Sequence, residues 1–187
     1  MGPHRRWWRG LAIGAMAVVL MAGCGDETQD GSDSGAEPST YATIKDAAAF
    51  DTTRTEVGDV FRDASQLAND ALGGEGLRGD GKVSDTLCNE AYPRRFSRLE
   101  SGVTFVAPGR PLADALQRVS DAWKQRGWDV EVLEPDRARL STKTSTGVPF
   151  GVYVSLQENQ NDAGTVGAGV TLSTRCLKLP AGVVDSL

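Results

Sequence analysis

The sequence predicts an α+β domain in which two helices pack on one face of an antiparallel sheet of about four to five strands. Two segments repeat apolar residues at spacings of three and four, which is the period of an amphipathic helix. Other segments alternate apolar with polar residues, which is the period of a half-buried strand. The order is helix, strand, helix and then four short strands joined by turns, and this order favours antiparallel pairing with the helices on one face.

The first predicted helix is defined by an apolar stripe that ends just before a pair of glycines. We expect Asp51 to cap its start, because aspartate accepts hydrogen bonds from free N–H groups, and Gly73-Gly74 to end it. A glycine-rich loop then leads to Cys88. The stripe consists of Val57, Val60, Phe61, Ala64, Leu67, Ala68, Ala71 and Leu72.

The second predicted helix begins after Pro111, runs to Arg126 and stops at Gly127. Both Trp123, near its end, and Trp128, just after it, fall on apolar sides of their segments. We therefore expect both to be core residues rather than a platform for stacking sugars. The stripe of this helix consists of Leu112, Ala115, Leu116, Val119, Ala122 and Trp123.

Five segments are predicted to form strands, and the clearest of them has five alternating apolar residues between Val148 and Leu156. Gly102 interrupts the alternation of the first strand and suggests a bulge there. The predicted strands cover 94–106, 128–132, 138–144, 148–156 and 166–174. Polar residues should line the other face of the sheet, open to solvent or a partner; they are Asp129, Glu131, Lys143, Tyr153, Ser155 and Gln157.

Residues 1–23 have the pattern of a signal peptide. A basic start is followed by an apolar run of about a dozen residues, which is shorter than the roughly 20 that a membrane-spanning helix needs. The sequence Met21-Ala22-Gly23-Cys24 that follows resembles a bacterial lipobox, although Met21 replaces the more usual Leu. The resemblance implies cleavage before Cys24 and diacylation of its sulfur; the alternative is an ordinary secretory signal that ends near a cysteine.

Residues 24–40 are predicted to form a disordered tether, and residues 41–187 a single domain. The tether carries five acids and no base and has almost no apolar residue, so it cannot bury enough surface to fold. The domain carries 17 bases and 20 acids, so no basic bias indicates a nucleic-acid partner.

The positions of histidine and cysteine exclude some kinds of catalysis and metal binding in the predicted mature protein. The single histidine, His4, lies in the signal peptide, which excludes Ser-His-Asp catalysis and His-ligated zinc after cleavage. We expect no metal and no cofactor. Lipidation of Cys24 would leave Cys88 and Cys176 as a pair, which we expect to be disulfide-bonded in an exported chain; two free thiols are the alternative.

Four short motifs have both a functional and a plain structural interpretation, and we favour the structural one for each. The segment 76–83 resembles a phosphate-binding loop, but Val83 stands where a hydroxyl would bind magnesium, and its Arg78-Gly79-Asp80 matches an adhesion tripeptide. We interpret it as a flexible loop. Asn159, Asn161 and Asp162 offer oxygens for calcium but fit a turn better. A possible patch for anionic head groups or glycopolymers, which we interpret instead as a solvated edge strand, consists of Tyr92, Arg94, Arg95, Phe96 and Arg98.

Two segments resemble parts of small actinobacterial envelope lipoproteins of unknown function. One is the passage from Ala122 to Val130, with Trp123, Gly127 and Trp128. The other is the ending Ser173-Thr174-Arg175-Cys176, in which Arg175 replaces a more usual proline. The resemblance implies an extracytoplasmic, lipid-anchored location at the cell membrane and no activity. We therefore expect a non-catalytic binding or accessory module. Its partners would be the bilayer, through Cys24, and an envelope protein, lipid or glycopolymer. The alternative is a carrier or sensor of a small apolar or lipid ligand held between helix and sheet, and a carboxylate- or Ser/Lys-based enzyme ranks third.

Overall fold

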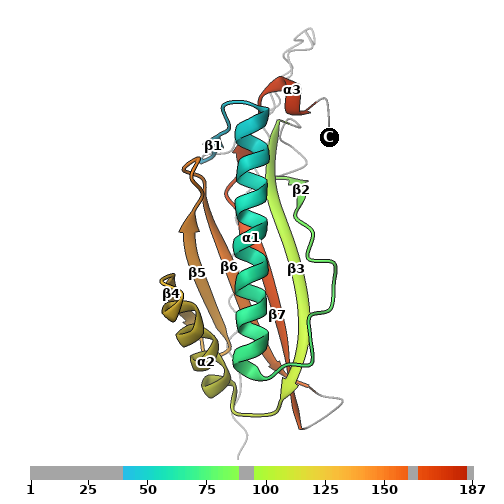
Figure 1. Cartoon of the computed structure of the whole chain (residues 1–187), viewed down its shortest axis with the longest axis vertical. Coiled ribbons are helices and arrows are strands. Elements are labelled where there is room, and N and C mark those ends of the chain that lie inside the picture. The colour runs from blue at the N-terminus through green and yellow to red at the C-terminus, as the bar shows by residue number, and fades with distance from the viewer. Residues whose placement is uncertain (1–39, 89–94, 160–163, 185–187) are drawn as a thin grey trace, which may run out of the picture. The chain divides into compact units, whose positions relative to one another are not determined.

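The computed structural model describes residues 40–88, 95–159 and 164–184, so the predicted lipidation site, Cys24, lies outside the described residues. Three helices and eight strands are present in the described part of the chain (Figure 1). The helices are α1 (Ala47–Leu72), α2 (Leu112–Gln125) and α3 (Ala181–Val184). The strands are β1 (Ala42–Thr43), β2 (Ser84–Leu87), β3 (Phe96–Pro108), β4 (Asp129–Glu134), β5 (Arg137–Lys143), β6 (Pro149–Glu158), β7 (Thr165–Thr174) and β8 (Leu177–Lys178).

The strands form one mixed sheet in the order β1-β8-β3-β7-β6-β5-β4, and β2 pairs with β3 outside this path. The pair β1 and β8 is parallel, and the other pairs are antiparallel. Strand β3 is 13 residues long and pairs with three others, β2, β7 and β8. Strand β3 therefore connects β2, from the first half of the domain, with β7 and β8 from its end.

The predicted antiparallel sheet of four to five strands is wrong, because the sheet is mixed and has eight strands. The additional strands β1, β2 and β8 contain only two to four residues, which is too few for alternation to be recognised. Helix α3, with four residues, is also too short to show a helical period. The bulge expected at Gly102 is absent, since Gly102 pairs with Thr171 in an unbroken register.

Helix α1 begins one turn earlier than predicted. Its N-cap is Asp46, whose carboxylate accepts a hydrogen bond of 2.8 Å from Ala49 N, and Asp51 is an exposed residue within the helix. The extra turn buries Phe50, which the predicted boundary left outside. At the other end, Gly73 adopts the left-handed conformation with φ of 67°, which allows the chain to leave the helix.

Helices α1 and α2 lie on the same side of the sheet (Figure 1), and the core fills the space between the two layers. Trp123 of α2 is fully buried there, and its Nε1 donates a 3.0 Å hydrogen bond to the Ala64 carbonyl of α1. Trp128 is partly buried against the same core. Val132 differs from the prediction of a half-buried strand: it is 52% exposed, because β4 is the last strand of the sheet and its register shifts after Val132.

Candidate functional site

The sheet has an open face, which is the face turned away from α1 and α2. Along β6 the buried residues Val152 and Val154 alternate with Tyr153 and with exposed Ser155, so these two sets point to opposite faces. The register extends the open face across the sheet, since Tyr153 pairs with Arg139 of β5, which pairs with Glu131 of β4. All six polar residues predicted for this face occupy it.

A hollow of about 360 Å³ lies on the open face over β5, β6 and β7. Gly151 of β6 is at its floor, paired with Ser141 of β5 on one side and with Ser173 of β7 on the other. A Cβ at position 151 would lie 3.1 Å from the Tyr153 ring, so the ring lies close over the glycine backbone. Glycine at this position leaves room for the Tyr153 ring, and the hollow lies beside the ring. We call it the Gly151 hollow, and the polar residues of its lining are Arg139, Ser141, Thr142, Tyr153, Ser173, Thr174 and Arg175.

Arg139 is held in place beside this hollow by two neighbours on the open face. Its Nη2 donates a 2.6 Å hydrogen bond to Glu131 Oε2. A hydrogen bond with Tyr153 and the charge of Glu131 raise the pKa of Arg139 above its ordinary value. The guanidinium therefore stays protonated, although Glu131 offsets part of its charge. Among the described residues Arg175 forms no salt bridge, so its charge is not offset in this way.

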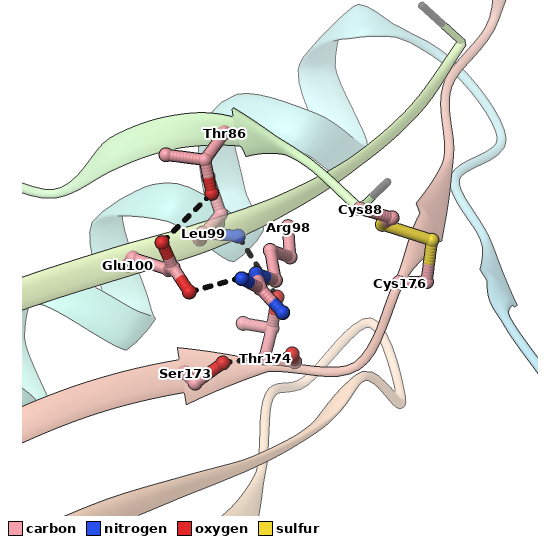
Figure 2. Close-up of a disulfide and its surroundings, with 8 residues drawn as sticks. All are labelled: Thr86, Cys88, Arg98, Leu99, Glu100, Ser173, Thr174 and Cys176. Carbon is pink, nitrogen blue, oxygen red and sulfur yellow. Dashed lines mark hydrogen bonds and ion pairs between the residues drawn. A yellow bond between two sulfur atoms is a disulfide. The ribbon is translucent and has the colours of Figure 1, made fainter. Parts of the chain in front are cut away.

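The predicted disulfide between Cys88 and Cys176 is confirmed, with their Cα atoms 5.8 Å apart. It joins the residue after β2 to the residue before β8, and Arg175 of the Gly151 hollow precedes Cys176 directly. Figure 2 shows the disulfide beside the ends of β2, β3 and β7. The covalent link therefore fixes the chain next to one wall of the hollow.

The residues around the disulfide are joined by polar contacts that cross from strand to strand (Figure 2). Glu100 of β3 binds Arg98 Nε through Oε1 at 2.7 Å, and its Oε2 accepts a 2.8 Å hydrogen bond from the Thr86 hydroxyl. Arg98 therefore forms a salt bridge with Glu100 of the same strand. Glu100 lies in the same cross-strand row as Ser173 and Gly151, which places this ion pair beside the hollow on the β3 side.

Of the basic and aromatic patch considered at 92–98, Tyr92 and Arg94 lie outside the described residues. The Arg95 guanidinium lies 5.3 Å from the centre of the Phe96 ring. Phe96 is fully buried under Tyr41, in an edge-on contact with ring centroids 5.3 Å apart. The Lys178 ammonium lies 5.2 Å from the centre of the Tyr41 ring. These contacts make Phe96 part of a small structural cluster at the first strand rather than an exposed binding group.

The glycine-rich segment 76–83 lies along β3 and is not a free loop. Arg78 exchanges two backbone hydrogen bonds with Thr104, at 2.7 and 2.9 Å. Arg54 of α1 donates a 3.0 Å bond to the Val83 carbonyl. Asn159, the first residue of the possible calcium turn, binds the Thr165 hydroxyl at 2.9 Å, and Asn161 and Asp162 are outside the described residues.

Arg139, Ser173 and Arg175 were not predicted as site residues. Alternation along each strand indicates that Arg139 and Ser173 share one face, but only the strand order places both beside Gly151. Within the described ranges no group of three or more His, Cys, Asp or Glu is placed to hold a metal ion. None of the described helices is long and apolar enough to cross a membrane. The chain gave no significant match to any family model, curated protein or solved structure.

Proposed function

We propose that the chain is exported, acylated at Cys24 and held at the extracytoplasmic face of the cell membrane as a non-catalytic binding module. The sequence supports this through the lipobox-like 21–24, the acidic tether and the basic start of the signal peptide. The confirmed disulfide is typical of exported proteins, because the cytosol keeps most thiols reduced.

The observation that carries the binding role is the open face of the sheet. Exposed residues such as Lys143, Ser155 and Thr171 show that no described element covers the face over β5, β6 and β7. The Gly151 hollow lies on this face. Ala42 N donates a 2.8 Å hydrogen bond to the carbonyl of Cys176, which directly follows Arg175 of the hollow. Strand β1, near the start of the predicted domain, therefore lies beside the residue that follows Arg175.

The space between the helices and the sheet gives no support to the alternative role as a carrier of an apolar ligand. Trp123, Phe61 and Phe105 fill it and are at most 1% exposed. A ligand held there would have to displace these side chains and lose their packing energy. The open face is therefore the surface that supports a binding role.

Acylation is tested by expressing the full chain in an actinobacterial host with an alkyne-labelled fatty acid. We expect the label and the membrane location in the wild type and their loss in Cys24→Ser, because two acyl chains give stable anchoring. The matched control is Cys88→Ser/Cys176→Ser, which should keep the label. Equal labelling of Cys24→Ser and the wild type would show that the lipid-anchor part of the proposal is wrong.

A further inference from the structure

We propose that the Gly151 hollow binds a phosphate group, carried by an anionic phospholipid headgroup or by a soluble phosphate ester. This inference rests on the proposed binding role of the open face and names the class of ligand. Arg139 and Arg175 would supply the charge, and the Ser141 hydroxyl would supply a further hydrogen bond. The Ser173 hydroxyl, which donates to the Thr174 carbonyl at 3.3 Å, would turn to the phosphate instead.

The charge of its lining distinguishes this hollow from four other hollows on the described surface. Its lining contains two arginines and no carboxylate. Each of four other hollows has at least one carboxylate in its lining, beside its own arginines. Two acids next to the lining are already paired: Glu131 binds Arg139, and Glu100, which lies opposite Ser173, binds Arg98. Because Arg175 has no such partner among the described residues, the hollow favours an anion.

The strand order places the donors around one point. Arg139 belongs to β5 and Ser173 to β7, and Gly151 lies on β6 between them. Neighbouring strands are about 5 Å apart, so groups on β5 and β7 flank a space about 10 Å wide. A phosphate group is a few ångströms across, so an arginine side chain on either side of that space can reach it. Arginine binds phosphate with two parallel hydrogen bonds. Gly151 contributes by leaving room for the Tyr153 ring to lie close to the sheet.

The proposed anchor makes a membrane headgroup reachable. A tether of 17 residues has a root-mean-square span of about 20 Å, which is enough for the open face to turn toward the bilayer. The tether joins the domain at β1, whose Ala42 contacts Cys176 beside Arg175. A soluble phosphate ester would satisfy the same donors, so the experiment must separate the two sources.

The test uses the full chain carrying Cys24→Ser, so that no acyl group contributes to binding. Two probes are compared: phosphatidylcholine vesicles with and without phosphatidylglycerol, and glycerol 1-phosphate in solution by calorimetry. We compare this chain with Arg139→Gln/Arg175→Gln in the same background. The matched control is Arg62→Gln/Arg126→Gln, which removes the same charge from the helix side, where these arginines pair with Asp59 and Asp63.

We expect binding to at least one probe, weakened about tenfold or more by the hollow variant and unchanged by the control. Binding to both probes identifies a general phosphate site, and binding to phosphatidylglycerol vesicles alone identifies a headgroup site. Arg175→Gln alone, which breaks no salt bridge among the described residues, should also weaken binding. The proposal is overturned if neither probe binds, or if the two double variants behave alike. Failure of acylation would not affect this test.

Discussion

At the scale of single residues, Thr174 shows how one hydroxyl completes the backbone pairing of the sheet. Its Oγ1 accepts a 2.9 Å hydrogen bond from the buried Leu99 N, across from β7 to β3 (Figure 2). Thr174→Val keeps the shape of the side chain and leaves this N–H without its acceptor. We expect the free energy of unfolding to fall by about 1 to 3 kcal/mol, measured by urea denaturation.

The matched control is Thr171→Val on the same strand, since Thr171 points to the open face and is exposed. Its free energy of unfolding should change by less than about 0.5 kcal/mol. If both substitutions have the same effect, the cost of Thr174→Val does not come from the lost hydrogen bond.

Residue environments were predictable where they depended on local pattern. The helical period placed Trp123 in the core, where it is fully buried. Local pattern does not explain the environment of Phe96, which lies on the open face by alternation and is nevertheless fully buried. Its cover is Tyr41, more than 50 residues away in the sequence, and no local pattern brings these two rings together.

At the scale of elements, helix α1 is attached to the turn between β5 and β6. Glu56 accepts hydrogen bonds from Ser145 Oγ at 2.5 Å and from Ser145 N at 2.7 Å. Beside them, the hydroxyls of Thr53 and Thr144 each lie 2.7 Å from the Thr146 hydroxyl, and Thr144 accepts from Val148 N. The turn is therefore positioned by the helix as well as by its own strands.

The bonds from Ser145 lower the pKa of Glu56 below its ordinary value of 4.5. A lowered pKa in the folded state stabilises the fold above the unfolded pKa, and this contribution is lost as the pH falls through the folded value. We expect Glu56→Gln to lower the free energy of unfolding by about 0.5 to 1 kcal/mol near pH 7, because Glu56 is exposed enough for solvent to weaken the interaction. Near pH 2 the difference from the wild type should shrink, as measured by denaturant unfolding at both pH values.

Glu75→Gln is the control, because Glu75 is an exposed carboxylate just after the same helix. It should change the free energy of unfolding at pH 7 by less than about 0.5 kcal/mol. A difference between Glu56→Gln and the wild type that stays constant between the two pH values would contradict the assignment.

Element prediction succeeded for segments long enough to show a period. The five predicted strands are present as β3 to β7, with ends that differ by a few residues. The two-residue strands β1 and β8 are fixed by pairing with each other and with β3, so their existence depends on contacts distant in the sequence. For this reason the number of strands and the mixed character of the sheet could not be predicted.

At the scale of the whole molecule, the Gly151 hollow depends on strand order. Its polar groups come from β5, β6 and β7 and the residue that follows β7. Alternation predicted which residues of β6 face outward, but the sequence gives no signal that Arg175 lies near Arg139. For the candidate site, therefore, only a polar open face could be predicted. The disulfide could be predicted because, once Cys24 is assigned to lipidation, only two cysteines remain to pair.

The disulfide links positions 88 residues apart, so it constrains much of the unfolded domain. In the chain-entropy account, closing a loop of this length stabilises the fold by about 4 to 5 kcal/mol. We expect Cys88→Ser/Cys176→Ser to lose up to this amount in urea denaturation of the full chain. The wild type measured with a reductant should lose the same amount, because both lack the cross-link. If the oxidised wild type and the double variant unfold at the same urea concentration, the bond does not stabilise the domain. If the free energy of unfolding falls only in the double variant, the serine side chains are the cause. If it falls equally in the variant and in the reduced wild type, the loss measures the contribution of the cross-link.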